Sequence, residues 1–206
     1  MESLHFFMSI SIPVPTKDVY RRLGYRRGIT QVNDDIKREI EDAIEYALSL
    51  IHLTGAGVRI PIEEIDQFNI VLSKSIAFNS SGLAKMLKGC SEVLLMGATA
   101  GKDIMEAIES DSKNNRLTRG VILDAVASEM VDASLDWISD YYNGQLRREN
   151  RQLTKRRFSA GYGDFLLENQ KIMYDVLQLG NLGVELTESC MLVPQKSVTA
   201  VAGIIG

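Results

Sequence analysis

The segment RFSAGYGD, residues 157–164, follows a run of arginine and lysine and precedes a segment with helical periodicity. A planar guanidinium such as that of Arg157 can form paired hydrogen bonds with a carboxylate or a phosphate. Gly161 permits a tight turn, and Tyr162 supplies an aromatic ring that could cover a ligand. The segment therefore predicts a loop that binds an anionic group. The rest of the chain has to indicate which ligand that is.

Composition limits the possible classes of protein. The chain has 206 residues, of which 45% are hydrophobic and 24% charged, which is ordinary for a globular protein and predicts a single domain over 1–206. The formal net charge of −4 argues against a general nucleic-acid binder. No apolar run reaches the about 20 residues that a membrane-spanning helix needs. Cys90 and Cys190 lie far apart, which indicates a reducing, cytoplasmic location.

The N-terminal half mixes strands and helices. LHFFMSISI, residues 4–12, predicts a strand that stops at the following prolines. Apolar residues at helical spacing predict a helix over 34–52. The glycine-containing segment 55–78 predicts a loop and then one or two strands. Ser80 is expected to cap a short helix that ends at Gly89.

The middle of the chain holds a buried strand and two helices. SEVLLMGAT, residues 91–99, predicts the strand, and AGKDIMEAIES, residues 100–110, predicts a helix entered through Gly97 and Gly101. That turn could direct N–H groups at an anion, although close packing is the preferred explanation of its small residues. A long helix is predicted from Leu117 to beyond Tyr142. Its polar side carries a row of carboxylates, which could bind metal or transfer protons but is more typical of a solvated face: Asp124, Glu129, Asp132, Asp136 and Asp140.

The C-terminal third completes the predicted fold class. The basic segment 143–157 could extend the long helix or connect it to the loop, and could contact an acidic partner or an anionic ligand. Residues 166–180 predict a helix ended by Gly180. Residues 183–206 predict two strands that form a β-hairpin with its turn near Pro194–Lys196. Together these elements predict an α+β fold, with a mixed or antiparallel twisted sheet and flanking helices.

Familiar catalytic motifs do not occur in the sequence. It contains no GxSxG, GxxxxGK[ST] or HExxH motif, and GATAGKD at 97–103 resembles a phosphate loop only weakly. His5 and His52 have no neighbours at metal-ligand spacing, and neither cysteine has a histidine in its own segment. We therefore assign no catalytic side chain and no metal ligand.

RFSAGYGD, read together with LGVELTESCMLVPQKSVTA at 182–200, resembles the activation domain of cobalamin (vitamin B12)-dependent methionine synthase, with its R-x-x-x-G-Y turn and later L-T-E and L-V-P strands. VLLMGATAGKDIMEAIES and RGVILDAVASEMVDASLDWI resemble the strand, helix and long helix of that family. The resemblance covers most of the chain from about residue 90 onward. It implies an activation-domain fold.

The resemblance also implies a function in methionine biosynthesis. Such a domain binds S-adenosylmethionine and presents it to cobalamin carried by a neighbouring part of the synthase. One electron, usually from flavodoxin, and the methyl group of the sulfonium then restore inactive cob(II)alamin. The family domain is normally part of a longer chain, so we expect this protein to act in trans, as a methyltransferase activation subunit, on a partner chain that binds cobalamin.

Site residues are carried over by motif. Arg157 is expected to bind the methionine carboxylate, and Gly161 to let the backbone pass close to the ligand. Tyr162 is expected near the sulfonium, and the backbone of Gly163 and Asp164 near the adenine. Glu129 and Glu188 are further candidates, for which structural roles are slightly preferred. The family's aspartate for the ligand's amino group could correspond to one of three residues: Asp18, Asp34 or Asp35.

Two other functions remain open at this stage. The protein could be a non-catalytic partner that docks on or caps a corrinoid protein without using S-adenosylmethionine. It could also be a methyltransferase that uses the same site on another acceptor. Arg157 in a surface ion pair and Tyr162 as a core aromatic are the corresponding structural explanations of the two main site residues.

Overall fold

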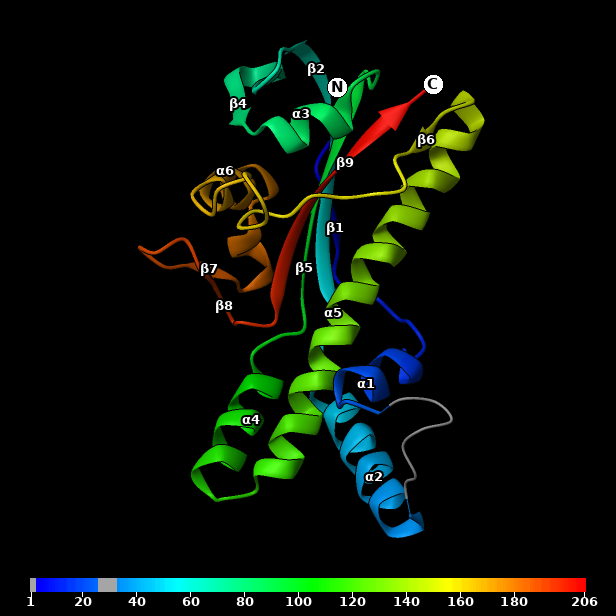
Figure 1. Ribbon diagram of the computed structural model, residues 1–206, viewed down its shortest axis with the longest axis vertical. Helices are drawn as coiled ribbons and strands as arrows, with labels where there is room; N and C mark the ends of the chain where they lie inside the picture. The colour runs from blue at the N-terminus through cyan, green and yellow to red at the C-terminus, as the bar shows by residue number, and fades with distance from the viewer. Residues whose placement is uncertain (1–2, 26–32) are drawn as a thin grey trace.

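An antiparallel sheet forms the centre of the computed structural model, which describes residues 3–25 and 33–206 (Figure 1). Within the described residues the strand order is β4-β3-β2-β5-β9-β6, and β1 pairs with β2 off this path. The strands are β1 (His5–Phe7), β2 (Thr54–Ile65), β3 (Asn69–Leu72), β4 (Ile76–Asn79), β5 (Glu92–Thr99), β6 (Gln152–Leu153) and β9 (Ser197–Ile205). Every neighbouring pair is antiparallel. The predicted α+β class with an antiparallel sheet is confirmed.

Helices cover both faces of the sheet. They are α1 (Thr16–Arg22), α2 (Asp34–Leu50), α3 (Ser81–Leu87), α4 (Asp103–Lys113), α5 (Leu117–Leu146) and α6 (Asn169–Leu177). Figure 1 shows α5 running diagonally along the molecule, with α1, α2 and α4 around its first half. These four helices share one hydrophobic core, whereas α3 and α6 pack into a second core on the other face of the sheet.

The central strand β5 contributes to both cores. Leu94 and Met96 belong to the core under α5, and Val93 and Leu95 belong to the core under α3 and α6. All four side chains are fully buried. A strand that is covered on both faces is expected to be continuously apolar, which explains why its sequence was recognisable.

Two segments of the N-terminal half, 4–12 and 55–78, differ from the prediction. The segment 55–78 does not begin with a loop, because Gly55 and Gly57 lie inside β2, and it forms three strands rather than one or two. A Cβ on Gly57 would lie 2.7 Å from Cε2 of Tyr142, so the glycine serves the close packing of α5 on the sheet. The first strand ends at Phe7, earlier than predicted, and beyond it the chain keeps a backbone hydrogen bond to the segment before β2, from Ile10 N to Leu53 O at 2.9 Å.

The C-terminal hairpin lies earlier than predicted. Strands β7 (Glu185–Leu186) and β8 (Leu192–Val193) pair across a turn in which Thr187 N donates to Met191 O at 2.9 Å. The strand after Pro194 is β9, which pairs with β5 instead of returning along β8. Successive side chains of β9 point to opposite faces of the sheet, and six consecutive residues are buried. A strand that is buried on both faces belongs inside the large sheet rather than in an exposed hairpin.

Two glycines lie elsewhere than predicted. The helix predicted over 166–180 is α6, which ends at Leu177, with Gln178 as its left-handed cap, rather than at Gly180. Gly97 lies inside β5 rather than in the turn into α4.

Other predicted elements are confirmed with small shifts. The helix predicted over 34–52 is α2, the capped helix at Ser80 is α3, and the long helix is α5. Asn33 Oδ1 accepts a hydrogen bond from Ile36 N, and Ser80 Oγ accepts one from Leu83 N, as expected of N-caps. The basic segment extends α5 to Leu146, continues through 3₁₀ turn η2 (Arg147–Glu149) and then forms the connector containing β6.

Candidate functional site

The loop at 157–165 is attached to the fold at two points besides Asp164. Phe158 and Val201 of β9 exchange both backbone hydrogen bonds, at 2.9 and 2.7 Å. Phe165 is fully buried, and its ring meets the ring of Phe78 in β4 edge to face with centroids 5.3 Å apart. The loop thus joins the central sheet at one end and the core under α3 at the other.

Asp164 forms the third attachment, to the first residues of α3. Its carboxylate accepts hydrogen bonds from Ser80 Oγ at 2.6 Å, from Ser81 N at 2.6 Å and from Ser81 Oγ at 2.7 Å. Gly82 N donates to the same carboxylate at 3.1 Å. The hydroxyl of Ser80, followed by the other donors, holds the pKa of Asp164 well below its ordinary value. The side chain of Asp164 is therefore engaged within the protein, where it holds the loop against the start of α3.

Tyr162 lies at the exposed tip of this anchored loop. Gly161 and Gly163 have φ values of +88° and +60°, which lie in a region that residues other than glycine rarely adopt. Gly161 N donates to Phe165 O at 2.8 Å and closes the turn. Tyr162 is 72% exposed, so it is not a core aromatic, and the loop presents its ring to solvent.

Arg157 lies at the other end of the loop and faces helix α5. Its Nη1 donates to Oδ1 of Asp136, and its Nη2 donates to the backbone carbonyl of Asp132 at 3.3 Å. The side chain is 31% exposed. A cavity of about 340 Å³ opens beside the guanidinium, between α5 and the segment that leads into the loop. Its lining consists of Asp136, Ser139, Asp140, Asn143, Leu153, Thr154, Lys155, Arg156, Arg157 and Ala202.

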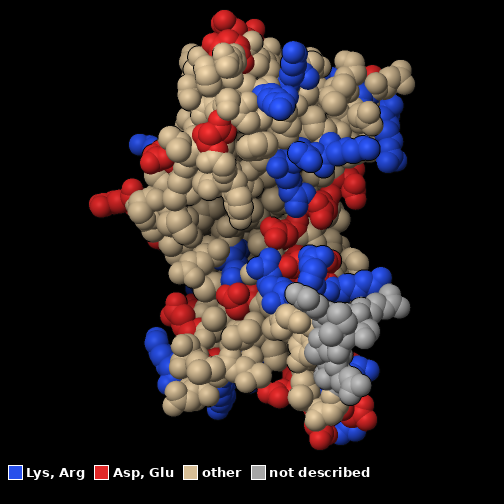
Figure 2. All heavy atoms as spheres, in the orientation of Figure 1, with Lys and Arg blue, Asp and Glu red and all other residues tan. Residues whose placement is uncertain are grey.

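Four carboxylates of the α5 row pair with cations from distant parts of the chain: Asp124, Glu129, Asp132 and Asp136. Arg22 Nε donates to Glu129 Oε1 at 2.6 Å, and Arg22 Nη2 lies 3.8 Å from Asp132 Oδ2. Burial raises the pKa of Asp132 against the opposing effect of Arg157. Figure 2 shows acidic and basic side chains gathered where the molecule narrows. The row is therefore more than the solvated face that the sequence favoured.

A further ion pair lies one turn before Glu129 on the same helix. Lys196 Nζ lies 2.7 Å from Asp124 Oδ1 and donates to Ser128 Oγ at 2.8 Å. This pair joins the residue before β9 to α5. The polar side of α5 is thus held by side chains from α1, from the loop and from the residue that precedes the C-terminal strand.

The candidate residues fall into two groups. Those at 157–164 form one loop. Glu129 is linked to Arg157 indirectly, because Arg22 pairs with both Glu129 and Asp132, and the Asp132 carbonyl accepts from Arg157. Glu188 lies exposed in the β7–β8 turn, and no hydrogen bond or ion pair of the described residues joins it to the loop. The three aspartates proposed for the amino group also lie elsewhere: Asp18 in α1 beside Arg21, and Asp34 and Asp35 at the start of α2.

Sequence reasoning missed the partners that position the loop. Ser80, Ser81 and Gly82 were recognised only as the start of a helix, and Asp136 only as part of a solvated face. The serine pair before a helix signals free donors, but not which distant carboxylate accepts from them. Pairing of Arg157 with α5 depends on the tertiary fold.

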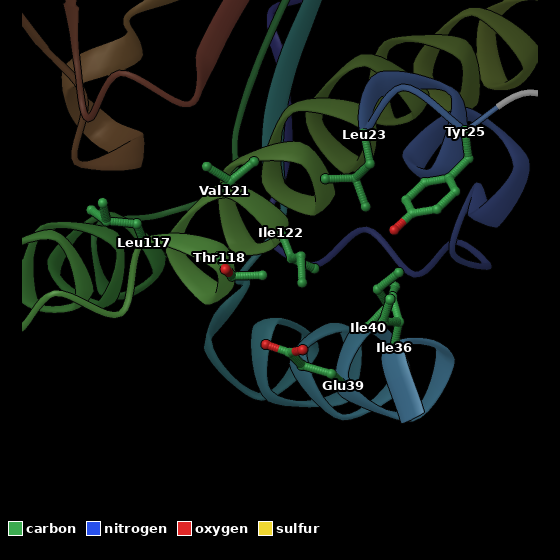
Figure 3. Close-up of a pocket in the computed structure, with 9 residues that line it drawn as sticks. All are labelled: Leu23, Tyr25, Ile36, Glu39, Ile40, Leu117, Thr118, Val121 and Ile122. Carbon is green, nitrogen blue, oxygen red and sulfur yellow. The ribbon is translucent and has the colours of Figure 1, made fainter. Parts of the chain in front are cut away.

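A second cavity, of about 390 Å³, lies at the opposite end of α5 from the C-terminal strand (Figure 3). Leu23 and Tyr25, which follow α1, face Ile36 and Ile40 of α2 across it. The remaining lining residues are Glu39, Leu117, Thr118, Val121 and Ile122. None of the predicted site residues lines this cavity, so it is not the site that the loop forms.

Comparison with known proteins gives a result at the level of structure. No family model and no curated protein sequence matches the chain. A crystal structure of the MetH reactivation domain bound to AdoHcy is similar with a TM-score of 0.69, and the match covers 98% of this chain and 78% of that chain. The chain has the MetH reactivation-domain fold. Because the sequences are only 13% identical, the likeness shows the fold alone, and it agrees with the resemblance seen in RFSAGYGD and LTESCMLVP.

Proposed function

We propose that this reactivation-domain fold binds S-adenosylmethionine and supports reductive remethylation of cob(II)alamin on a cobalamin-dependent methionine synthase in trans. The anchored loop 157–165, which presents an arginine and an exposed tyrosine on either side of a glycine turn, carries the proposal. Support comes from the structural neighbour, a reactivation domain that holds AdoHcy, the demethylated form of that ligand.

The loop residues have separate roles in this proposal. Arg157 binds the methionine carboxylate of the ligand through its guanidinium. The ring of Tyr162 packs against the positively charged sulfonium, a contact that aromatic faces favour. The φ of +88° at Gly161 lets the backbone turn beside the ligand, and the backbone of Gly163 and Asp164 contacts the adenine. Glu129 acts on the site indirectly, through the carboxylate row, and Glu188 is assigned no contact.

The protein contributes position and exclusion of water in this reaction, with no nucleophile of its own. One electron from a low-potential donor reduces cob(II)alamin, and the sulfonium then gives its methyl cation to the reduced cofactor. S-adenosylhomocysteine leaves with the pair of electrons from the broken carbon–sulfur bond. Cobalamin supplies the methyl-accepting metal, and it is carried by the partner chain.

An electron donor with an acidic surface, such as flavodoxin, suits the exposed cations near the loop. Arg147, Arg148, Lys155 and Arg156 are exposed, and no ion pair is recorded for these four with the described carboxylates. Figure 2 shows basic side chains gathered on the same face, above the narrow part of the molecule. Opposite charge accelerates the encounter of two proteins, so this surface favours association with an acidic donor. The cytoplasm is the compartment that we propose for the reaction.

Among residues 3–25 and 33–206 no helix has the length and apolar character required to cross a bilayer. Cys90 and Cys190 are both free thiols in the structure.

The decisive experiment combines binding and turnover. Calorimetric titration of S-adenosylmethionine is expected to show binding that is lost in Arg157→Ala and kept in Arg21→Ala, whose exposed pair with Asp18 lies in α1. A synthase fragment that holds cob(II)alamin is then mixed with the protein, S-adenosylmethionine and a one-electron reductant. The visible spectrum is expected to change to that of methylcobalamin. No binding and no spectral change would overturn the proposal.

One observation favours a second function. Arg157 is already paired with Asp136, and a guanidinium that stays in this pair would suit a protein that docks on a corrinoid partner without using S-adenosylmethionine. Tight binding to the cobalamin protein with no binding of S-adenosylmethionine would select that function. Ligand binding followed by methyl transfer to a different acceptor, with no effect on cobalamin, would instead identify a methyltransferase.

A further inference from the structure

Asp136 and a ligand carboxylate require the same atoms of Arg157. Both terminal nitrogens of the guanidinium donate to groups of α5, Nη1 to the Asp136 carboxylate and Nη2 to the Asp132 carbonyl. A carboxylate that binds arginine end-on uses these two nitrogens as its pair of donors. Both terminal nitrogens of Arg157 are therefore occupied in the ligand-free protein.

Charge around Arg157 opposes a second carboxylate beside the first. Glu129, Asp132 and Asp136 supply three negative charges, against two positive charges from Arg22 and Arg157. A ligand carboxylate that bound beside Asp136 would bring a fourth negative charge into this cluster. Like charges a few ångströms apart repel, so the ligand and Asp136 disfavour one another.

Asp136 is the acceptor that can leave. Its side chain is 69% exposed, so water can replace the guanidinium when the pair opens. An exposed ion pair of this kind contributes little stability. The Asp132 acceptor is a backbone carbonyl of α5, and it cannot move without disturbing the helix.

We infer that Asp136 occupies the carboxylate subsite of Arg157 in the free protein and is displaced by the ligand, so that Asp136 lowers the affinity for ligands that carry a carboxylate. This inference rests on the proposed function. Asp136 is thus a specificity-determining residue. It disfavours ligands that bind through a carboxylate alone, because only a ligand with further contacts to the loop gains enough binding energy to displace Asp136 from Arg157.

The test measures the dissociation constants of two ligands for four proteins by calorimetry at low salt. The ligands are S-adenosylmethionine and its decarboxylated analogue, which keeps the sulfonium and the amine. The proteins are wild type, Asp136→Asn, Arg157→Ala and the control Asp124→Asn. The control removes the same charge, and an ion pair with Lys196, from a half-exposed position about 18 Å away along α5.

Asp136→Asn is expected to bind S-adenosylmethionine about two- to fivefold more tightly than wild type, which is the range expected when an exposed ion pair no longer competes. Its affinity for the decarboxylated analogue is expected to stay unchanged, and Asp124→Asn is expected to match wild type with both ligands. Thermal unfolding of each variant reports whether it is folded.

Three results would overturn the inference. Unchanged or weaker binding of S-adenosylmethionine by folded Asp136→Asn would show that Asp136 orients Arg157 instead of competing. Equal tightening for both ligands would show that Asp136 does not compete with the ligand carboxylate. Wild type that binds neither ligand would refute the proposed function and the inference with it, whereas binding that needs Arg157 but ignores Asp136 would refute the inference alone.

Discussion

Ser80 and Asp164 are joined by a 2.6 Å hydrogen bond from the serine hydroxyl to the carboxylate, although they lie far apart in the sequence. Ser80 also caps α3 through its bond from Leu83 N. One serine thus begins a helix and holds the end of the candidate ligand loop. A substitution that disturbs the start of α3 should therefore also disturb the loop, and the reverse should hold.

Replacing Asp164 with asparagine is expected to lower the melting temperature and weaken S-adenosylmethionine binding, because the amide cannot accept from all of the donors at Ser80, Ser81 and Gly82. The control is Asn33→Ala, which removes the cap of α2 and costs about 1 kcal/mol while leaving ligand affinity unchanged. Calorimetry and thermal unfolding measure both. Equal affinity losses in the two variants would contradict a specific role for Asp164.

Acid should remove the contribution of Asp164 to stability. The pKa of Asp164 is lower in the folded chain than the value of about 3.9 expected in the unfolded chain. The carboxylate therefore stabilises the fold fully at pH values above the unfolded pKa, and it loses this effect as the pH falls toward the folded pKa. The difference in unfolding free energy between wild type and Asp164→Asn should be constant near neutral pH. It should shrink below about pH 4, as urea titrations at several pH values would show.

Gly82→Ala is expected to destabilise the protein, although glycine-to-alanine changes within helices usually stabilise. A Cβ at this position would lie 2.9 Å from Oδ1 of Asp164 and 3.1 Å from Cζ of Phe158, which forces the loop away from α3. Gly144→Ala in α5 is the matched control, because nothing lies within 4 Å of its Cβ position. That control should gain about 0.5–1 kcal/mol of unfolding free energy. Urea unfolding measures both variants, and a stabilised Gly82→Ala would contradict the prediction.

Arg59→Met should cost about 1–3 kcal/mol of unfolding free energy, because removing this buried cation leaves Glu92 and Glu149 with hydrogen bonds unmade and with Arg151 as their cationic neighbour. The Arg59 guanidinium binds Glu92 at 3.0 Å and Glu149 at 2.8 Å, and only 5% of the side chain is exposed. Arg21→Ala, which breaks an exposed pair in α1, should change stability by less than about 0.5 kcal/mol. Similar losses in both variants would argue against burial as the cause.

Tyr162 should matter for the ligand and not for the fold. The ring is 72% exposed, so Tyr162→Ala should leave the melting temperature unchanged. A lost contact with the sulfonium should weaken S-adenosylmethionine binding by about 0.5–2 kcal/mol, and Tyr162→Phe should keep most of the affinity. The demethylated product lacks the positive charge, so its binding should depend less on the ring.

Prediction from the sequence succeeded where a local pattern determined the structure. The continuous apolar run of β5 and the helical spacing in α2 and α5 correspond directly to buried faces. It failed where distant residues determine the local conformation. Gly55 and Gly57 resemble loop residues until α5 is placed on them, and the C-terminal hairpin was misplaced because β9 pairs with β5.

The candidate site was predictable as a motif and not as an arrangement. Arg157, Gly161 and Tyr162 could be selected from one short segment, which the structure forms into a loop with an exposed ring and a left-handed glycine. The partners of Arg157 and Asp164 come from α5 and α3, which no local pattern connects to the loop. Whether the loop binds S-adenosylmethionine remains a prediction that the titrations test.

The pairing of β5 with β9 also affects how the chain reaches this structure. During synthesis on the ribosome, β5 emerges long before β9, so that one edge of an almost wholly apolar strand has no partner until Ser197–Ile205 has been made. Unpaired apolar edges of this kind promote aggregation, and long-range strand pairs form slowly. We therefore expect nascent chains that end before β9 to depend on chaperones, and fragments of that length to accumulate as inclusion bodies.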